Sequence, residues 1–127
     1  MADLKMKLIE EKLGVCRVQR DMQIPAWALS GQFFSITKTH EELSIVCSEN
    51  FVPEGVVCEK GWRALMVEGP LDFSLIGILS QISTALAEVK ISIFAISTYD
   101  TDYILIKAKE MDKAISELRR KGYIIEL

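Results

Sequence analysis

The segment ISIFAISTYDTDYILIK, residues 91–107, consists of two apolar arms separated by a short polar insert. The first arm, residues 91–98, is rich in the β-branched and aromatic side chains that favour a strand buried on one or both faces. The second arm, residues 103–107, repeats this composition. The segment therefore predicts a β-hairpin, and the rest of the chain can be organised around it.

The polar insert of this hairpin, residues 97–102, is unusually dense in functional groups. It contains three aliphatic hydroxyls, one phenol and two carboxylates. A simple connection between strands needs fewer polar groups than this, so the insert indicates a binding site. Aspartate is also common in hairpin connections, where it bonds to the local backbone, and Asp100 and Asp102 are open to that purely structural interpretation.

Length and composition set the class of protein. The chain has 127 residues, half of them apolar, which is enough for one compact unit or two very small ones. Charged or polar residues interrupt every apolar segment before it reaches the ~18 residues of a membrane span. The start of the chain is charged, with Asp3, Lys5 and Lys7, and does not resemble a signal peptide. We therefore expect a cytoplasmic protein without a membrane partner.

The charge balance argues against nucleic-acid binding. The net charge is −3, and dividing the chain after Trp62 gives 7 basic and 9 acidic residues, then 8 basic and 9 acidic residues. Neither half offers the positive face that neutralises phosphates. An RNA-binding sheet would also need several exposed aromatic residues, and Phe94 and Tyr103 are too few. We expect no nucleic-acid partner.

The cysteines and the single histidine do not predict a metal or catalytic site. Cys16, Cys47 and Cys58 are odd in number and have no CxxC spacing, so we expect buried thiols rather than a disulfide framework or a zinc site. His40 has no ligand partner at a suitable spacing and no motif connects it to a thiol, so nucleophilic catalysis is not indicated. The prediction is that the chain has no catalytic residues, no metal and no cofactor.

The second half of the chain has a clear order of elements. Residues 63–68 form a short apolar strand, Gly69 and Pro70 end it, and Asp72 or Ser74 can cap the helix that follows. After the central hairpin, residues 110–121 have helical periodicity, and residues 123–127 form a last strand. The order strand, helix, strand, strand, helix, strand is that of a ferredoxin-like α+β unit.

The first half of the chain predicts a less regular unit. Residues 5–19 read as one long or broken strand, with a helical alternative for residues 4–13. Pro25 permits a short helix over residues 26–29. Residues 32–49 contain two apolar runs around a polar tip, which is the pattern of an antiparallel hairpin.

The chain resembles the ACT domain family, the amino-acid-binding regulatory modules. Ile96, Ser97 and Thr98 match the strand end of the C-terminal ACT repeats of aspartate kinases, and Gly69, Asp72 and Gly77 lie upstream as in an ACT loop. Nearly the full length also resembles half of the eukaryotic cytosolic arginine sensors. The residues that match those sensors are Phe33, Phe34, Ser35, Thr37, Thr39, Ser97, Thr98, Tyr99, Thr101 and Asp102. This resemblance implies two ferredoxin-like βαββαβ units with antiparallel sheets and helices on one face: a degenerate N-terminal unit over residues 1–62 and a complete one over residues 63–127.

The resemblance implies a free amino acid as ligand. The ammonium group needs acceptors and the carboxylate needs N–H donors, and Asp72, Asp102 and the backbone beside Gly69 offer these. Thr98 and Tyr99 would complete the pocket, and a cationic amino acid would suit its acidic character. As in the arginine sensors, Ser92 and Ile93 of a second subunit would face these residues, so the resemblance implies a homodimer. Any output would pass to an unidentified regulated protein.

Two other classes of function compete with this hypothesis. Asp72 can be only a helix cap, and the protein would then be an interaction module that binds no ligand. A small ferredoxin-like phosphatase would need an arginine and a glycine-rich loop to hold phosphate, but Glu68 and Asp72 place negative charge there. We therefore expect a regulatory protein rather than an enzyme.

Overall fold

The computed structural model describes residues 4–68 and 77–127. The chain divides into two compact units: a C-terminal unit formed by residues 1–10 together with Arg63–Leu127, and an N-terminal unit formed by Glu11–Trp62. This division differs from the sequence-based one at residues 4–10, which lie with the C-terminal unit. The reason is that the strand formed by Lys5–Leu8 pairs with two strands of that unit.

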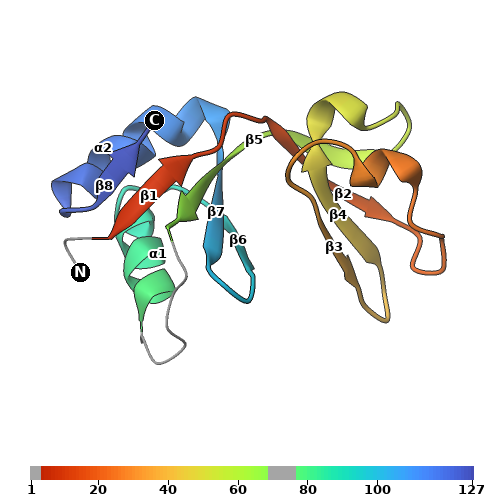
Figure 1. The fold of residues 1–127 in the computed structure, drawn as a ribbon, viewed down its shortest axis with the longest axis horizontal. Helices are drawn as coiled ribbons and strands as arrows, with labels where there is room; N and C mark the ends of the chain where they lie inside the picture. Colours follow the sequence, from red (N-terminus) through yellow and green to blue (C-terminus); the bar gives the residue numbers. More distant parts are fainter. Residues whose placement is uncertain (1–3, 69–76) are drawn as a thin grey trace. The chain divides into compact units, whose positions relative to one another are not determined.

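The C-terminal unit has five strands and two α-helices among its described residues. Its sheet has the order β6-β7-β5-β1-β8, and only the second half of β5 belongs to this unit. Figure 1 shows these elements along the chain. Their bounds are β1 Lys5–Leu8, β5 Val57–Val67, α1 Ile78–Glu88, β6 Phe94–Ser97, β7 Asp102–Lys107, the 3₁₀ turn η3 Ala108–Glu110, α2 Met111–Arg120 and β8 Ile124–Glu126.

The predicted α+β ferredoxin-like order is confirmed, with one additional strand. Each helix connects two strands that are not adjacent, so each crossover leaves a gap in the sheet. β7 fills the first gap, while β5 and β1 together fill the second. β1 runs antiparallel to β5, with Met6 opposite Val67, and parallel to β8, with Met6 opposite Ile125.

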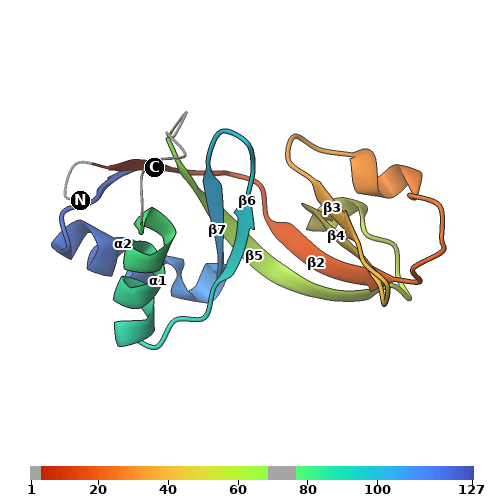
Figure 2. The same cartoon turned by 90° about the horizontal axis from the view of Figure 1, so that it is seen from below.

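A single hydrophobic core lies between one face of this sheet and both helices. Every second side chain along a strand points to the same face of the sheet. Leu65 and Val67 of β5, and likewise Ile104 and Ile106 of β7, therefore all point into this core. Figure 2 shows α1 and α2 on the same side of the strands. The helices contribute most of the remaining buried side chains, which are Ile78, Ile82, Ala85, Leu86, Met111, Ala114, Ile115 and Leu118.

The helix ends agree in part with the sequence-based expectations. From the sequence, a glycine at position 122 after the second helix predicts a left-handed stop; Gly122 follows the capping residue Lys121 and has φ +100°, so this prediction is confirmed. At the start of α1, Gly77 is the capping residue, also with a left-handed φ of +81°. The predicted caps Asp72 and Ser74 lie outside the described residues.

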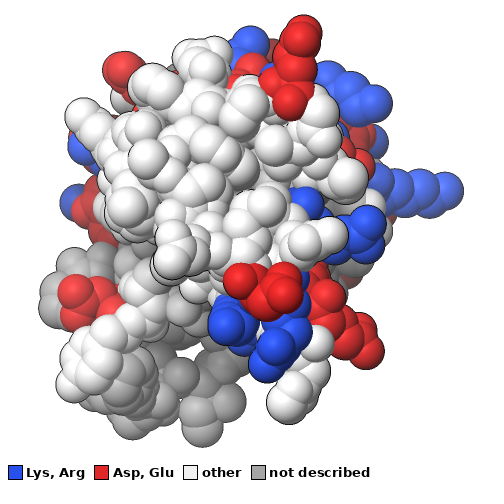
Figure 3. All heavy atoms as spheres, turned by 90° about the vertical axis from the view of Figure 1, so that its right-hand side faces the viewer, with Lys and Arg blue, Asp and Glu red and all other residues white. Residues whose placement is uncertain are grey.

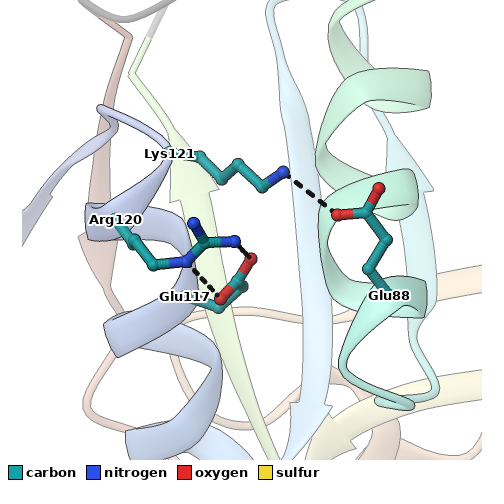
Figure 4. Close-up of polar contacts among 4 residues, drawn as sticks. All are labelled: Glu88, Glu117, Arg120 and Lys121. Carbon is teal, nitrogen blue, oxygen red and sulfur yellow. Dashed lines mark hydrogen bonds and ion pairs between the residues drawn. The ribbon is translucent and has the colours of Figure 1, made fainter.

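Two ion pairs involve the end of α2. Figure 4 shows Lys121 reaching Glu88 of α1, with Nζ and Oε1 3.0 Å apart, and Arg120 in a two-bond contact with Glu117. The side chain of Glu117 is only 9% exposed. The hydrogen-bonded Arg120 guanidinium lowers the pKa of the Glu117 carboxyl below its ordinary value.

We expect Glu117→Gln to make the stability of the fold less dependent on acid pH. Because the pKa of Glu117 is lowered by folding, its contribution is present above pH 4.5, the ordinary value, and is lost as the pH falls below it. Thermal unfolding should give a lower Tm for Glu117→Gln than for the wild type at pH 7, and the two Tm values should converge towards pH 3. An equal difference at both pH values would contradict this assignment.

The N-terminal unit is a four-stranded antiparallel arrangement in the order β3-β4-β2-β5. The predicted broken strand over residues 5–19 is confirmed, because β1 and then β2 pair with β5, and the helical alternative for residues 4–13 is wrong. The predicted short helix and hairpin are also confirmed. The elements are β2 Leu13–Val18, the 3₁₀ turn η1 Ala26–Leu29, β3 Ser35–Lys38, β4 Leu43–Ser48 and the 3₁₀ turn η2 Glu49–Phe51.

The N-terminal unit carries an extended uncharged surface. No charged residue occurs from residue 22 to residue 37, and Met22, Ile24 and Leu29 in this segment are each about half exposed. Figure 3 views the molecule from the side on which β3 and β4 are drawn in Figure 1, and Lys, Arg, Asp and Glu surround a broad uncharged area there.

No described helix is long and apolar enough to cross a membrane.

Candidate functional site

The polar turn between β6 and β7 is closed by its own threonines. The Thr98 backbone N–H donates to the Thr101 carbonyl at 2.7 Å, and the Thr98 hydroxyl donates to the same oxygen at 3.1 Å. The Thr101 N–H in turn donates to the Thr98 hydroxyl at 3.2 Å. These three bonds hold residues 98–101 in one conformation without help from a ligand.

A second polar pair lies at the base of the turn. Ser97 and Asp102 are directly opposite each other in the β6–β7 register, and the Ser97 hydroxyl donates to Asp102 Oδ1 at 2.6 Å. Asp102 is half-buried, and the serine fixes the orientation of its carboxylate. A carboxylate held in this way is preorganised to accept further hydrogen bonds from a cationic group.

Thr101 connects the turn to the end of β5. Its side chain is 8% exposed, and its hydroxyl donates to the backbone carbonyl of Val67. Val67 is the last residue of β5 and precedes Gly69 by two positions. The turn therefore lies beside the point where the segment with Gly69 and Asp72 begins, although both of those residues lie outside the described residues.

The structure brings some of the predicted site residues together and separates others. Thr98 and Asp102 share the turn with Tyr99, whose side chain is 82% exposed. Ser92 and Ile93 precede β6 and therefore lie at the opposite end of this strand from the turn. Ser92 is exposed, whereas Ile93 is partly buried against the core.

The sequence-based site omitted Ser97 and Thr101, the two residues that brace it. Ser97 could have been predicted from the hairpin register, because it is directly opposite Asp102 in the β6–β7 pair. Thr101 belongs to the polar insert, but its contact with Val67 had no local signal, because that carbonyl lies 34 residues away. Within the described chain, no group of His, Cys, Asp and Glu is arranged to hold a metal ion.

A shallow pocket elsewhere in the C-terminal unit contains none of the predicted ligand residues. It has a volume of about 290 Å³ and lies where α1 meets the chain after α2. Thr84 and Glu88 come from α1, while Lys121 and Tyr123 follow α2. Two of its lining residues, Lys121 and Glu88, form the ion pair that joins the two helix ends.

The C-terminal unit is thus a small split-βαβ domain with a hydrogen-bonded polar turn beside the end of a neighbouring strand. The family model of the ACT domain matches residues 57–120, which is half of the chain. The chain belongs to the ACT domain family. A further family model, described as an N-terminal domain, matches residues 11–55.

Among sequence relatives, the chain is similar to subunit 1 of the cytosolic arginine sensor for mTORC1 from Bos taurus. The two are 29% identical over 101 residues, which cover 71% of this chain. The match spans only 31% of the bovine protein. The suspected resemblance to the arginine sensors is therefore confirmed as a similarity to part of such a sensor.

Solved structures extend the similarity over the full length. A crystal structure of a protein from Agrobacterium tumefaciens is 34% identical, with a TM-score of 0.92, covering 98% of this chain and 93% of that one. The ligand-free regulatory subunit of aspartate kinase from Thermus thermophilus has a TM-score of 0.62 over 91% of this chain and 95% of that one, at 10% identity. The second similarity shows a shared fold.

We expect the contact between Thr101 and Val67 to stabilise the C-terminal unit. Thr101→Val keeps the shape of the side chain but leaves the Val67 carbonyl without its partner, which costs about 1–3 kcal/mol for a buried group. Thr101→Ser is the matched control, since it keeps the hydroxyl and loses one methyl group. Urea denaturation should show a larger loss of unfolding free energy for the valine variant, and a larger loss for serine would contradict the bond's importance.

Proposed function

We propose that this protein is a small regulatory ACT protein that binds a free amino acid, with the ligand held between the C-terminal units of a homodimer. The observation that carries the proposal is the polar turn itself. Its hydrogen bonds preorganise Thr98 and Asp102, and the Thr101 hydroxyl fixes both beside the end of β5. A site that is rigid before binding loses little conformational entropy when the ligand arrives.

The chemistry of an amino acid assigns a role to each part of this site. Asp102, oriented by Ser97, would accept hydrogen bonds from a cationic group of the ligand. Gly69 and Asp72, in the segment that follows β5, would provide backbone N–H donors for the ligand carboxylate and a second acidic group. Tyr99, exposed at the tip of the turn, would form a wall of the pocket. The similarity to a protein named as an arginine sensor supports a cationic amino acid such as arginine.

The position of the remaining predicted residues supports the homodimer. Ser92 and Ile93 lie at the far end of β6, so one chain does not bring them to its own turn. In a dimer, Ser92 and Ile93 of one copy would complete the site formed by Thr98, Tyr99 and Asp102 of the other. The pocket would then exist only in the assembled protein.

The same proposal covers the function of the whole protein. We infer that it has no catalytic residues and acts in the cytoplasm, supported by its similarity to a cytosolic sensor and to a regulatory subunit. The signal would pass to a regulated protein that binds the dimer. The N-terminal unit would be the degenerate ACT-like partner of the complete C-terminal one.

The uncharged surface of the N-terminal unit favours a second candidate function, that of an interaction module without a ligand. Met22, Ile24 and Leu29 expose about half of their surface in a segment without charges. A groove of about 600 Å³ near Met22 is also lined by Val18, Val56 and the largely exposed Val57. The same groove is also lined by Arg17, Gln19 and Glu41. Exposed apolar side chains beside polar ones are common at protein contact sites.

We expect at least one of the twenty amino acids, with arginine and lysine foremost, to raise the Tm of the protein. A ligand present at about 100 times its Kd stabilises the folded state by about 2.7 kcal/mol, because it binds only that state. Asp102→Ala should abolish this rise, whereas Asp100→Ala on the same exposed turn should keep it. If no amino acid shifts the Tm, the interaction-module candidate replaces the ligand-binding one.

The dimer is tested separately by the mass of the particle in solution. Sedimentation velocity at micromolar concentration should give twice the mass of the chain, and the ligand should strengthen the association because it contacts both copies. A charged substitution at the exposed residue of the predicted contact, Ser92→Asp, should shift the protein towards monomer. A wild-type monomer at all concentrations, with or without ligand, would contradict the shared pocket.

A further inference from the structure

All three cysteines of the chain gather on one face of the N-terminal unit, although they are far apart in sequence. Cys16 on β2 is directly opposite Cys58 on β5 in the strand register. Cys47 on β4 is opposite Gly14, which is two residues before Cys16 and therefore on the same face of β2. The three thiols belong to the same hydrophobic cluster.

Gly14 provides the space that lets these sulfurs approach one another. A Cβ atom at position 14 would lie 2.7 Å from the Cys58 Sγ, closer than real side chains come. The sulfur of Cys58 thus occupies the volume that any larger residue would fill. Cys16 is directly opposite Cys58 across the strand pair and two residues along β2 from the position opposite Cys47, which makes it the central cysteine of the three.

The three thiols differ in their access to solvent. Cys16 is 2% exposed and Cys47 is fully buried, whereas Cys58 is partly exposed. Burial raises the pKa of the Cys16 thiol, and it raises the pKa of Cys47 to about 11. A small oxidant from solvent therefore meets Cys58 first, with Cys16 as the neighbouring thiol.

We propose that Cys58 and Cys16 are a redox-active pair that forms a reversible disulfide between β5 and β2 when the protein meets hydrogen peroxide. The Cys58 sulfur attacks one peroxide oxygen, the O–O bond breaks, and Cys58 becomes a sulfenic acid while the other oxygen leaves as water. The Cys16 sulfur then attacks the sulfenic sulfur, and the displaced hydroxide leaves as a second water with the Cys16 proton. Two thiols are oxidised and one molecule of hydrogen peroxide is reduced.

The strand geometry favours this pair over the other combinations. Directly opposite residues in an antiparallel pair have Cβ atoms about 4.5–5.5 Å apart, and a disulfide needs about 3.5–4.5 Å, so a small local approach is sufficient. Cys47 is offset by two residues along β2 and has no such direct partner among the cysteines. The disulfide would close a loop that contains β3 and β4, so the oxidised protein should melt at a higher temperature.

The test is peptide mapping of the whole protein after treatment with hydrogen peroxide and alkylation under denaturing conditions. We expect a linked peptide that joins Cys16 to Cys58, a mass loss of two hydrogen atoms, and recovery of both thiols with dithiothreitol. Cys47→Ser is the matched control and should still form the link. Cys16→Ser and Cys58→Ser should not form an intramolecular disulfide, with circular dichroism confirming that each variant is folded.

Three results would overturn the proposal. One is a disulfide in the wild-type protein that uses Cys47. Another is an intramolecular disulfide that still forms in the folded Cys16→Ser variant. The third is a wild-type protein in which Cys58 passes to sulfinic acid, or stays reduced, without any link to Cys16. Because the wild-type map alone distinguishes these outcomes, the proposal is testable even if a serine variant fails to fold.

Discussion

The geometry of the candidate site depends on one buried backbone carbonyl. The Val67 oxygen lies at the buried end of β5 and accepts a hydrogen bond from the Thr101 hydroxyl. An unsatisfied buried carbonyl is costly, so this bond fixes the turn against β5. The bonds from Thr98 and Ser97 then orient the turn and the Asp102 carboxylate locally. The conformation of the turn thus depends on bonds within the hairpin, whereas its position in the fold depends on the bond from Thr101 to Val67.

The local features of the fold were predictable from the sequence, whereas its long-range strand pairing was not. The hairpin, both helices and the left-handed stop at Gly122 leave periodic or residue-specific signals within a short window. The sequence predicted β1 as part of a broken strand, but its single fully buried residue, Met6, does not indicate which strands it pairs with. Its position between β5 and β8 is set by pairing with residues more than 50 positions away, which no local pattern encodes.

The candidate site and the cysteines show the same limit of prediction from the sequence. The polar insert identified Thr98 and Asp102 as neighbours, but the bracing role of Thr101 depends on β5 and became visible only with the fold. The expectation of buried thiols holds for Cys16 and Cys47. The cysteine spacing gave no reason to pair Cys16 with Cys58, because their proximity results from strand register and from the missing side chain of Gly14.

The distance between the two ends of β6 bears on the proposed dimer. A strand rises about 3.3 Å per residue, so Ser92 and Thr98 are separated by roughly 20 Å if the chain between them is extended. A single free amino acid is too short to contact both positions. Either the site uses only the turn and the segment after β5, or it borrows Ser92 and Ile93 from a second copy. In the second case ligand binding and association would be thermodynamically linked, so that the amino-acid concentration would change the degree of assembly.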